Sequence, residues 1–179
     1  MSQAPPAYEA IKAKLNAVSP TFCLAKWLQV TLHLDRGFTH SCHHPKTHKI
    51  PLSELKTNHT ALHNTQKKIK FRQEMLEGKQ TAECAYCWNI ENLGPEHYSD
   101  RHFKSATEWA APHLEEVLQN PLNPRISPRY LEVSFSRACN FRCSYCSAIC
   151  SSSWIQDITR QGPYPGRQWE TSVENLDEI

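Results

Sequence analysis

The chain has 179 residues, eight of them cysteine, and its 20 lysine and arginine residues nearly balance 18 aspartate and glutamate residues, giving a net charge of +2. A charge this small argues neither for nor against nucleic acid, so no nucleic-acid partner is indicated. No apolar run approaches the ~20 residues of a membrane span, and the opening MSQAPPAYEAIKAK lacks the apolar core and cleavage site of a signal peptide. We therefore expect a cytoplasmic protein with no membrane partner.

In chain order, residues 1–20 are predicted to be a polar, proline-containing lead. Residues 21–44 predict a β-hairpin, because apolar residues alternate along its first half and the segment LDRGF suits the tip. The alternating residues are Val30, Leu32 and Leu34. Gly37 can adopt the positive φ that such a tip requires.

A basic helix is expected next, capped by Asn64 or Thr65 and stopped by Gly78 after about Glu77. Its inward face is predicted to hold Ile69, Met75 and Leu76. Its basic residues indicate a solvated face rather than a nucleic-acid patch; they are Lys67, Lys68, Lys70 and Arg72.

Two shorter helices are expected in the middle of the chain. One begins at Cys84 and Cys87 and ends near Gly94. A mixed polar stretch, residues 95–112, precedes another helix that begins at Pro112. The apolar residues of that helix are Leu114, Val117 and Leu118. Asn120 and Pro121 are expected to stop it.

The last third begins with a proline-rich segment, residues 121–129, which we predict to be a linker and domain boundary. Alternation then predicts a strand over 130–135, with Leu131, Val133 and Phe135 on one face. Ser153 and Gln156 resemble a capping box at the start of a helix. The apolar residues of this helix are Trp154, Ile155 and Ile158.

Cys139, Cys143 and Cys146 form a C-x3-C-x2-C motif directly after the strand. A loop this short can wrap one small inorganic cluster, and three thiolates leave one iron of a 4Fe–4S cube open to another molecule. The alternatives are a disulfide pair or a zinc site, but zinc sites usually add a second ligand pair ~12–20 residues away, and none follows Cys146. Cys150 could be a fourth ligand; we expect instead a buried thiol at the start of the next helix.

The motif resembles the signature of the radical SAM superfamily, C-x3-C-x-aromatic-C, with Tyr145 at the aromatic position and Asn140 and Phe141 after the first cysteine. The resemblance implies that the open iron binds the amino and carboxylate groups of S-adenosylmethionine, with Tyr145 on the adenine side. An electron from the cluster then cleaves the sulfonium and releases a 5′-deoxyadenosyl radical, which abstracts a hydrogen from the substrate.

The other cysteines resemble the opening of the SPASM and twitch segments, which hold auxiliary 4Fe–4S clusters in many radical SAM enzymes. They form C-x13-G-x4-C from Cys23 through Gly37 to Cys42, and C-x2-C at Cys84 and Cys87. The resemblance implies that these four thiolates close one auxiliary cluster. The further C-x5-C-x3-C of a full SPASM domain is absent after Cys87, so a second auxiliary cluster is not expected.

The resemblance extends over nearly the whole chain, through TFCLAKWLQV, EMLEGKQTAECAYCWNIENLG and YLEVSFSRACNFRCSYC followed by SSSW. The similar proteins carry a twitch-like segment before the barrel. This chain departs at His43, where many of them have a second cysteine, and at Lys26, which replaces the usual proline and is expected to have little consequence. The histidine-rich segment HSCHHPKTH could instead bind zinc.

The predicted fold is an α+β cluster-binding segment over residues 21–120, followed by the start of an α/β partial (β/α)6 radical SAM barrel over 130–179. Such a barrel needs roughly 200 residues, and the GGE segment that family members place at the end of the second strand is not found. We therefore expect a fragment, split gene or truncated product that binds S-adenosylmethionine weakly until a separate chain completes the barrel.

The leading functional prediction is a radical SAM enzyme, or its cluster-binding part, that modifies a peptide or protein. The resemblance implies a reductant such as ferredoxin or flavodoxin, and it identifies no catalytic side chain. The alternative is a non-catalytic metal-binding module that holds structural zinc or a cluster beside an inactive barrel remnant.

Overall fold

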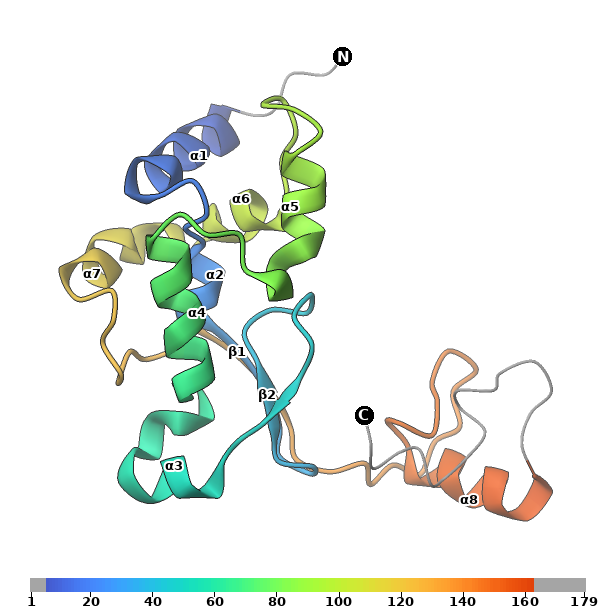
Figure 1. The fold of residues 1–179 in the computed structure, drawn as a ribbon. Coiled ribbons are helices and arrows are strands. Elements are labelled where there is room, and N and C mark those ends of the chain that lie inside the picture. Colours follow the sequence, from blue (N-terminus) through green and yellow to red (C-terminus); the bar gives the residue numbers. More distant parts are fainter. Residues whose placement is uncertain (1–5, 163–179) are drawn as a thin grey trace. The chain divides into compact units, whose positions relative to one another are not determined.

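The computed structural model describes residues 6–162, and the chain divides into two compact units (Figure 1). The first unit consists of the chain up to Leu32 together with Phe38–Glu132, and the second of His33–Gly37 together with the chain from Val133. The segment predicted as a linker, residues 121–129, thus belongs to the first unit, and the division of the chain comes after it.

Short helices make up most of the first unit. In chain order they are α1 (Pro6–Val18), α2 (Leu24–Leu28), α3 (Leu52–Thr57), η1 (His59–Leu62), α4 (Gln66–Leu76), η2 (Ala82–Cys84), α5 (Ala85–Glu91), α6 (Asp100–Ser105), η3 (Ala111–His113) and α7 (Leu114–Gln119), where η denotes a 3-10 helix. No helix within residues 6–162 is long and apolar enough to cross a membrane.

One four-stranded sheet has the strand order β3-β2-β1-β4. Its strands are β1 (Gln29–His33), β2 (Phe38–His40), β3 (His48–Lys49) and β4 (Tyr130–Ser134). β2 and β3 pair antiparallel. The Arg129 amide donates to the Leu28 carbonyl at 2.7 Å and the Leu34 amide donates to the Ser134 carbonyl at 2.9 Å, so β4 runs in the same direction as β1.

The core of the first unit packs around Trp27, whose indole Nε1 donates to the carbonyl of Pro121 at 2.6 Å. α1 adds Ile11 and Leu15 to this core, so the prediction of a polar lead over residues 1–20 was wrong. Apolar side chains at 11, 15 and 18 have helical spacing, which the prolines at the beginning of the chain obscured. The other fully buried apolar side chains here are Phe22, Leu24, Leu28, Met75 and Val117.

The hairpin predicted over 21–44 is confirmed around its tip, but Leu24–Leu28 form the helix α2 instead of a strand. β1 and β2 flank a tip at which Gly37 has a φ of 74°. The alternation is less strict than expected, because Thr31 is buried together with Val30 and Leu32, whereas Leu34 is exposed. β1 lies between β2 and β4, and an inner strand can be buried on both faces.

The predicted boundaries of the basic helix α4 are also confirmed. The Thr65 hydroxyl accepts a hydrogen bond from the Lys68 amide at 3.2 Å, and Gly78 ends the helix with a φ of 76°. Met75 is fully buried on the inward face, as expected, while Ile69 and Leu76 are half-buried.

The solvated basic face predicted for α4 is wrong at two positions, because Lys68 and Arg72 are each only 1% exposed. The Lys68 ammonium donates to the Thr39 hydroxyl at 2.8 Å. The Arg72 guanidinium donates to the Asn64 side chain at 2.7 Å and to the Lys26 carbonyl at 3.1 Å. Acceptors outside the helix satisfy both side chains, and no periodicity within the helix can reveal them.

The polar stretch 95–112 contains a helix that the sequence did not predict. α6 buries Arg101, His102 and Ser105, none of them apolar. The predicted helices at α5 and α7 are present. Within 121–129, Ile126 is buried and its carbonyl accepts from the Asn64 side chain at 2.8 Å, so this segment is bound to the first unit along its length rather than free.

The second unit contains α8 (Ser152–Gln161), which packs through a small apolar cluster. The predicted strand is present as β4, although Leu131 and Phe135 on its predicted apolar face are 56% and 74% exposed. Ser151, not Ser153, caps α8, since its hydroxyl accepts from the Trp154 amide at 3.4 Å. The cluster consists of Ala148, Ile149, Trp154, Ile155 and Ile158.

Candidate metal centres

Four cysteines of the first unit line a single cavity, although three separate segments of the chain supply them. The cavity holds about 380 Å³ of space between atoms, including its opening to solvent. Cys84 and Cys87 are buried, Cys23 and Cys42 are half-buried, and all four are free thiols. The structure therefore brings together the same four cysteines that the sequence resemblance grouped.

Local structure explains how each thiol reaches this cavity. Cys23 is the residue before α2, and Cys42 follows the end of β2. Cys84 ends η2 and Cys87 lies one helical turn further in α5, so the two share a face. A helix start, a hairpin end and one helical turn thus supply the four ligands.

Backbone and side-chain donors face three of the four sulfurs. Burial and the neighbouring thiols raise the pKa of Cys23 to about 12, whereas a hydrogen bond from the Lys26 amide lowers it. Burial also raises the pKa of Cys42, and the His44 amide opposes that shift. Buried thiols with N–H donors aimed at them are arranged to hold thiolates once a cation is present to compensate their charge.

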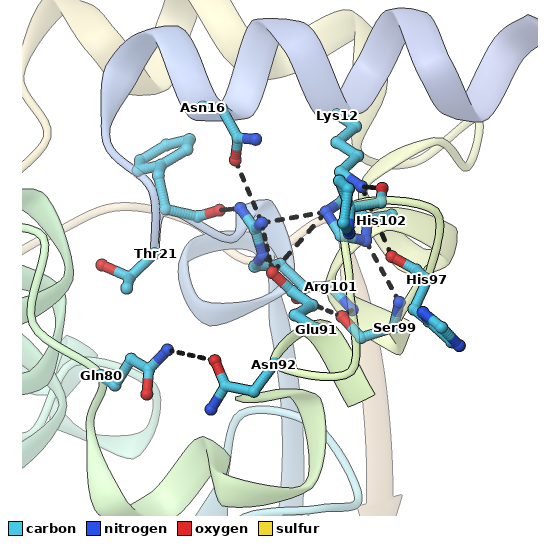
Figure 2. A network of polar contacts seen from close by, with 12 residues as sticks. Lys12, Asn16, Thr21, Gln80, Glu91, Asn92, His97, Ser99, Arg101 and His102 are labelled. Carbon is cyan, nitrogen blue, oxygen red and sulfur yellow. Dashed lines mark hydrogen bonds and ion pairs between the residues drawn. The ribbon is translucent and has the colours of Figure 1, made fainter. Parts of the chain in front are cut away.

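Cys87 has the most extensive support. Burial raises the pKa of its thiol to about 11, although the Ser99 hydroxyl and the Arg101 amide lower it. Figure 2 shows the surroundings of these two groups: the Ser99 hydroxyl donates to a Glu91 carboxylate oxygen at 2.5 Å, and the Arg101 guanidinium makes two hydrogen bonds to the same carboxylate, at 2.9 and 2.6 Å, and a third to Asn16 at 3.1 Å. Arg101 is 2% exposed, so this network fixes the start of α6 against the sulfur.

The spacing of the sulfurs distinguishes between kinds of metal centre. Among residues 6–162, the one trio of histidine, cysteine or acidic ligand atoms lying within 4.8 Å of one another is His43, His44 and Asp100. No three of the cavity sulfurs are that close. Four thiolates on one zinc ion, with Zn–S near 2.3 Å, lie roughly 3.8 Å apart, so these side chains would have to move together to bind a single ion.

The histidine trio next to Cys42 has a simpler explanation than metal binding. The Nε2 atoms of His43 and His44 lie 3.3 and 2.8 Å from the same Asp100 oxygen, and Lys104 Nζ lies 3.0 Å from His43 Nδ1. A lysine ammonium donates to Nδ1, which leaves the proton of His43 on Nε2, where a metal would have to bind. His44 also stacks on Tyr86, with ring centroids 3.8 Å apart.

Lys26 also lines the cysteine cavity and is 3% exposed. The expectation that this replacement has little consequence stays a prediction, although the position of Lys26 gives it a site at which it could act. Sequence analysis also missed Arg101, Glu91 and Ser99, which position the donors to Cys87. Lys26 could have been found from its place three residues after Cys23, one helical turn away, whereas the polar stretch around Arg101 carried no comparable signal.

The second unit holds Cys139, Cys143 and Cys146 in a loop that serines of α8 anchor. The Ser152 hydroxyl accepts from the Cys139 amide at 3.0 Å, and the Ser153 hydroxyl donates to the Cys139 carbonyl at 2.6 Å. The three thiols are half-buried. The serine-rich start of this helix therefore holds the loop in shape while the sulfurs remain accessible.

Tyr145 and Cys150 lie at the surface of this loop. Tyr145 is 90% exposed, and a hydrogen bond with Cys143 raises the pKa of its hydroxyl. Cys150 is exposed and precedes the helix, so the prediction of a buried thiol was wrong. Its side chain is not held in the apolar cluster that its neighbours Ala148 and Ile149 join.

Comparison of this chain with models of protein families, with curated proteins and with solved structures yields no match.

Proposed function

We propose that this protein binds two iron–sulfur clusters, one in the cavity of Cys23, Cys42, Cys84 and Cys87 and one in the loop of Cys139, Cys143 and Cys146. The observation that carries the proposal is the convergence of four free thiols from three segments of the chain on one cavity. Four protein thiolates would close the first cluster, as suits an electron relay or a structural anchor.

The loop cluster is the proposed catalytic one. Three thiolates leave one iron open, and the motif resembles that of radical SAM enzymes, so this iron would take the amino and carboxylate groups of S-adenosylmethionine. The exposed Tyr145 would lie on the adenine side. The proposed activity is reductive cleavage of S-adenosylmethionine to a 5′-deoxyadenosyl radical, with a peptide or protein as the substrate and ferredoxin or flavodoxin as the electron donor.

A structural zinc module is the competing proposal, because four cysteines are also a common zinc ligand set. The sulfur spacing speaks against it, since zinc would require the four side chains to close in on one another. The metal content of anaerobically prepared protein separates the two proposals.

The test is reconstitution with iron and sulfide in the absence of oxygen. We expect about eight irons per chain, falling to about four in either Cys23→Ala or Cys143→Ala. Cys150→Ala is the matched control and should keep all of them, because this thiol lies at the surface outside both ligand sets. About one zinc in place of iron, or a cluster lost in Cys150→Ala, would contradict the proposal.

A second measurement assigns the clusters. With saturating S-adenosylmethionine, the electron paramagnetic resonance signal of the reduced loop cluster should change, because its open iron gains ligands, while the signal of the closed cavity cluster stays the same. Cys23→Ala and Cys143→Ala isolate the two signals. A change at the cavity cluster alone would reverse the proposed roles.

A further inference from the structure

Lys26 places a positive charge in a buried position, where a nearby negative charge is needed to balance it. Its side chain is 2% exposed and lines the cysteine cavity. Its ammonium lies 3.1 Å from a Glu83 carboxylate oxygen and 5.6 Å from the centre of the Phe71 ring. Burying an ammonium is costly unless negative charge lies near it, so the surroundings of Lys26 must provide that charge.

Glu83 does not provide all of it. The same carboxylate pairs with Lys67, whose ammonium lies 3.7 Å from the other oxygen. Glu83 therefore pairs with two lysines, of which Lys67 is 49% exposed and also stabilised by water, whereas Lys26 is buried at the wall of the cavity.

The other cations near the cavity differ from Lys26 in pairing or in burial. Arg101 pairs with Glu91 at 2.6 Å. Lys104 also lines the cavity, and its charge, like that of Lys26, lowers the pKa of Cys42, but Lys104 is only half-buried. Lys68 adds little charge at neutral pH, because burial, and then the charges of Arg72 and Lys26, lower its pKa to about 6.

The cysteines are the remaining source of negative charge. Lys26 lines the same cavity as Cys42 and Cys84, so these cysteines would place negative charge near its side chain once they bind a metal as thiolates. The Lys26 side chain thus faces ligands from two of the three segments, and its backbone amide serves the third through Cys23.

We propose that Lys26 is a buried counter-cation of the cysteine cavity, where its fixed charge offsets the thiolates and favours both uptake and reduction of the bound cluster. This inference rests on the proposed function. In the reduction, an external donor such as dithionite supplies one electron, which adds one negative charge to a centre that four thiolates already make anionic. A buried positive charge close by stabilises the reduced form more than the oxidised form.

The experiment measures the reduction potential of the cavity cluster in a Cys143→Ala background, by redox titration followed by electron paramagnetic resonance. Lys26→Met removes the charge at nearly constant length and should lower the potential, so that the ratio of reduced to oxidised cluster at a fixed applied potential falls about tenfold or more. Lys26→Arg keeps the charge and should stay within about twofold of the parent. Glu83→Gln removes the competing anion and should shift the potential the other way.

Lys70→Met is the matched control. Lys70 lies on α4, as Lys67 and Lys68 do, but its side chain is 74% exposed and pairs with Glu74. Loss of the Lys70 charge should therefore leave the reduction potential of the cavity cluster unchanged. If Lys26→Met matches the parent in potential and iron content, or shifts it no more than Lys70→Met does, the inference is overturned.

Iron content separates this inference from the proposed function. If the parent chain takes up no cluster in the cavity, the proposed function fails and the inference fails with it. If Lys26→Met folds by circular dichroism but takes up no iron, while Lys26→Arg does, the counter-cation is supported through uptake instead of potential. Loss of iron in both variants would show that Lys26 acts through packing, which overturns the inference.

Discussion

The cysteine cavity of the first unit and the cysteine loop of the second are built in opposite ways. Four thiols in the cavity come from three segments and lie among buried donors and cations. Three thiols in the loop come from one short segment, held mainly by serine hydroxyls at the start of α8. The cavity depends on the whole unit, whereas the loop depends on one helix.

This difference predicts which changes in the protein would disrupt each site. A ligand set drawn from distant segments exists only while the surrounding core is folded, so damage to that core should also damage the site. A ligand set within eight residues persists as long as its local anchor does. We therefore expect the cavity to be most sensitive to changes in the buried Arg101–Glu91 network. The loop should be most sensitive to changes at Ser151, which caps α8.

Acid should have the largest effect on the first unit. Burial, with a smaller contribution from nearby cations, lowers the pKa of His48 and His102 to about 4 and of His63 to about 2. In the unfolded chain these side chains titrate near ~6.5. A folded-state pKa below the unfolded value means that stability is complete above pH ~6.5 and is lost as pH falls towards 4, at about 1.4 kcal/mol per pH unit for each histidine.

Hydrogen exchange measured by mass spectrometry between pH 7 and 4 checks this expectation, once corrected for the intrinsic pH dependence of exchange. Peptides from the α1, α2 and α4 regions should lose protection as pH falls. Protection that stays constant down to pH 4 would mean that the three histidines are not held neutral. His102→Gln, which removes one titrating group, should flatten part of the response.

Breaking the buried ion pair should come next in size. Glu91→Ala leaves the Arg101 guanidinium buried without its carboxylate, and the loss of one partner of such a pair costs roughly 3–5 kcal/mol of unfolding free energy. The comparison in the second unit is Asp157→Ala, which removes the partner of Arg142, a side chain that is 56% exposed. That change should cost less than about 1 kcal/mol.

Urea denaturation followed through hydrogen exchange of each unit measures the loss of unfolding free energy in both variants. Equal effects of Glu91→Ala and Asp157→Ala would contradict the claim that burial separates the two pairs. Glu91→Ala should also slow iron uptake at the cavity while leaving the loop unchanged, since Arg101 and Ser99 position the donors to Cys87.

The smallest effect is expected at the cap of α8. Ser151→Ala removes an acceptor for the Trp154 amide and a donor to the Phe141 carbonyl, 2.9 Å away. Loss of a serine cap typically costs about 1 kcal/mol, so the first turn of α8 and the attached loop should exchange faster while the first unit is unaffected. Thr159→Ala, at an exposed position further along α8, is the control. Equal exchange in the two variants would mean that Ser151 does not anchor the loop.

Local features of this protein could be predicted from its sequence because they depend on neighbours in the chain. Gly37 at a hairpin tip, Thr65 at a helix start, Gly78 at a helix end and the C-x3-C-x2-C spacing all reflect backbone geometry over a few residues. The grouping of Cys23 and Cys42 with Cys84 and Cys87 came from a resemblance, and the structure brings these four residues to one cavity.

Only the tertiary structure decided which charged residues are buried. No periodicity predicts the burial of Lys26, Lys68, Arg72 and Arg101, because each also hydrogen-bonds a group that lies at least 29 residues away in the chain. The sequence alone indicated the hairpin tip at Gly37, both ends of α4 and the cysteine motifs, but not α1 or α6. The fold determined which polar groups meet, since the free energy of burying a charge depends on the partner that reaches it.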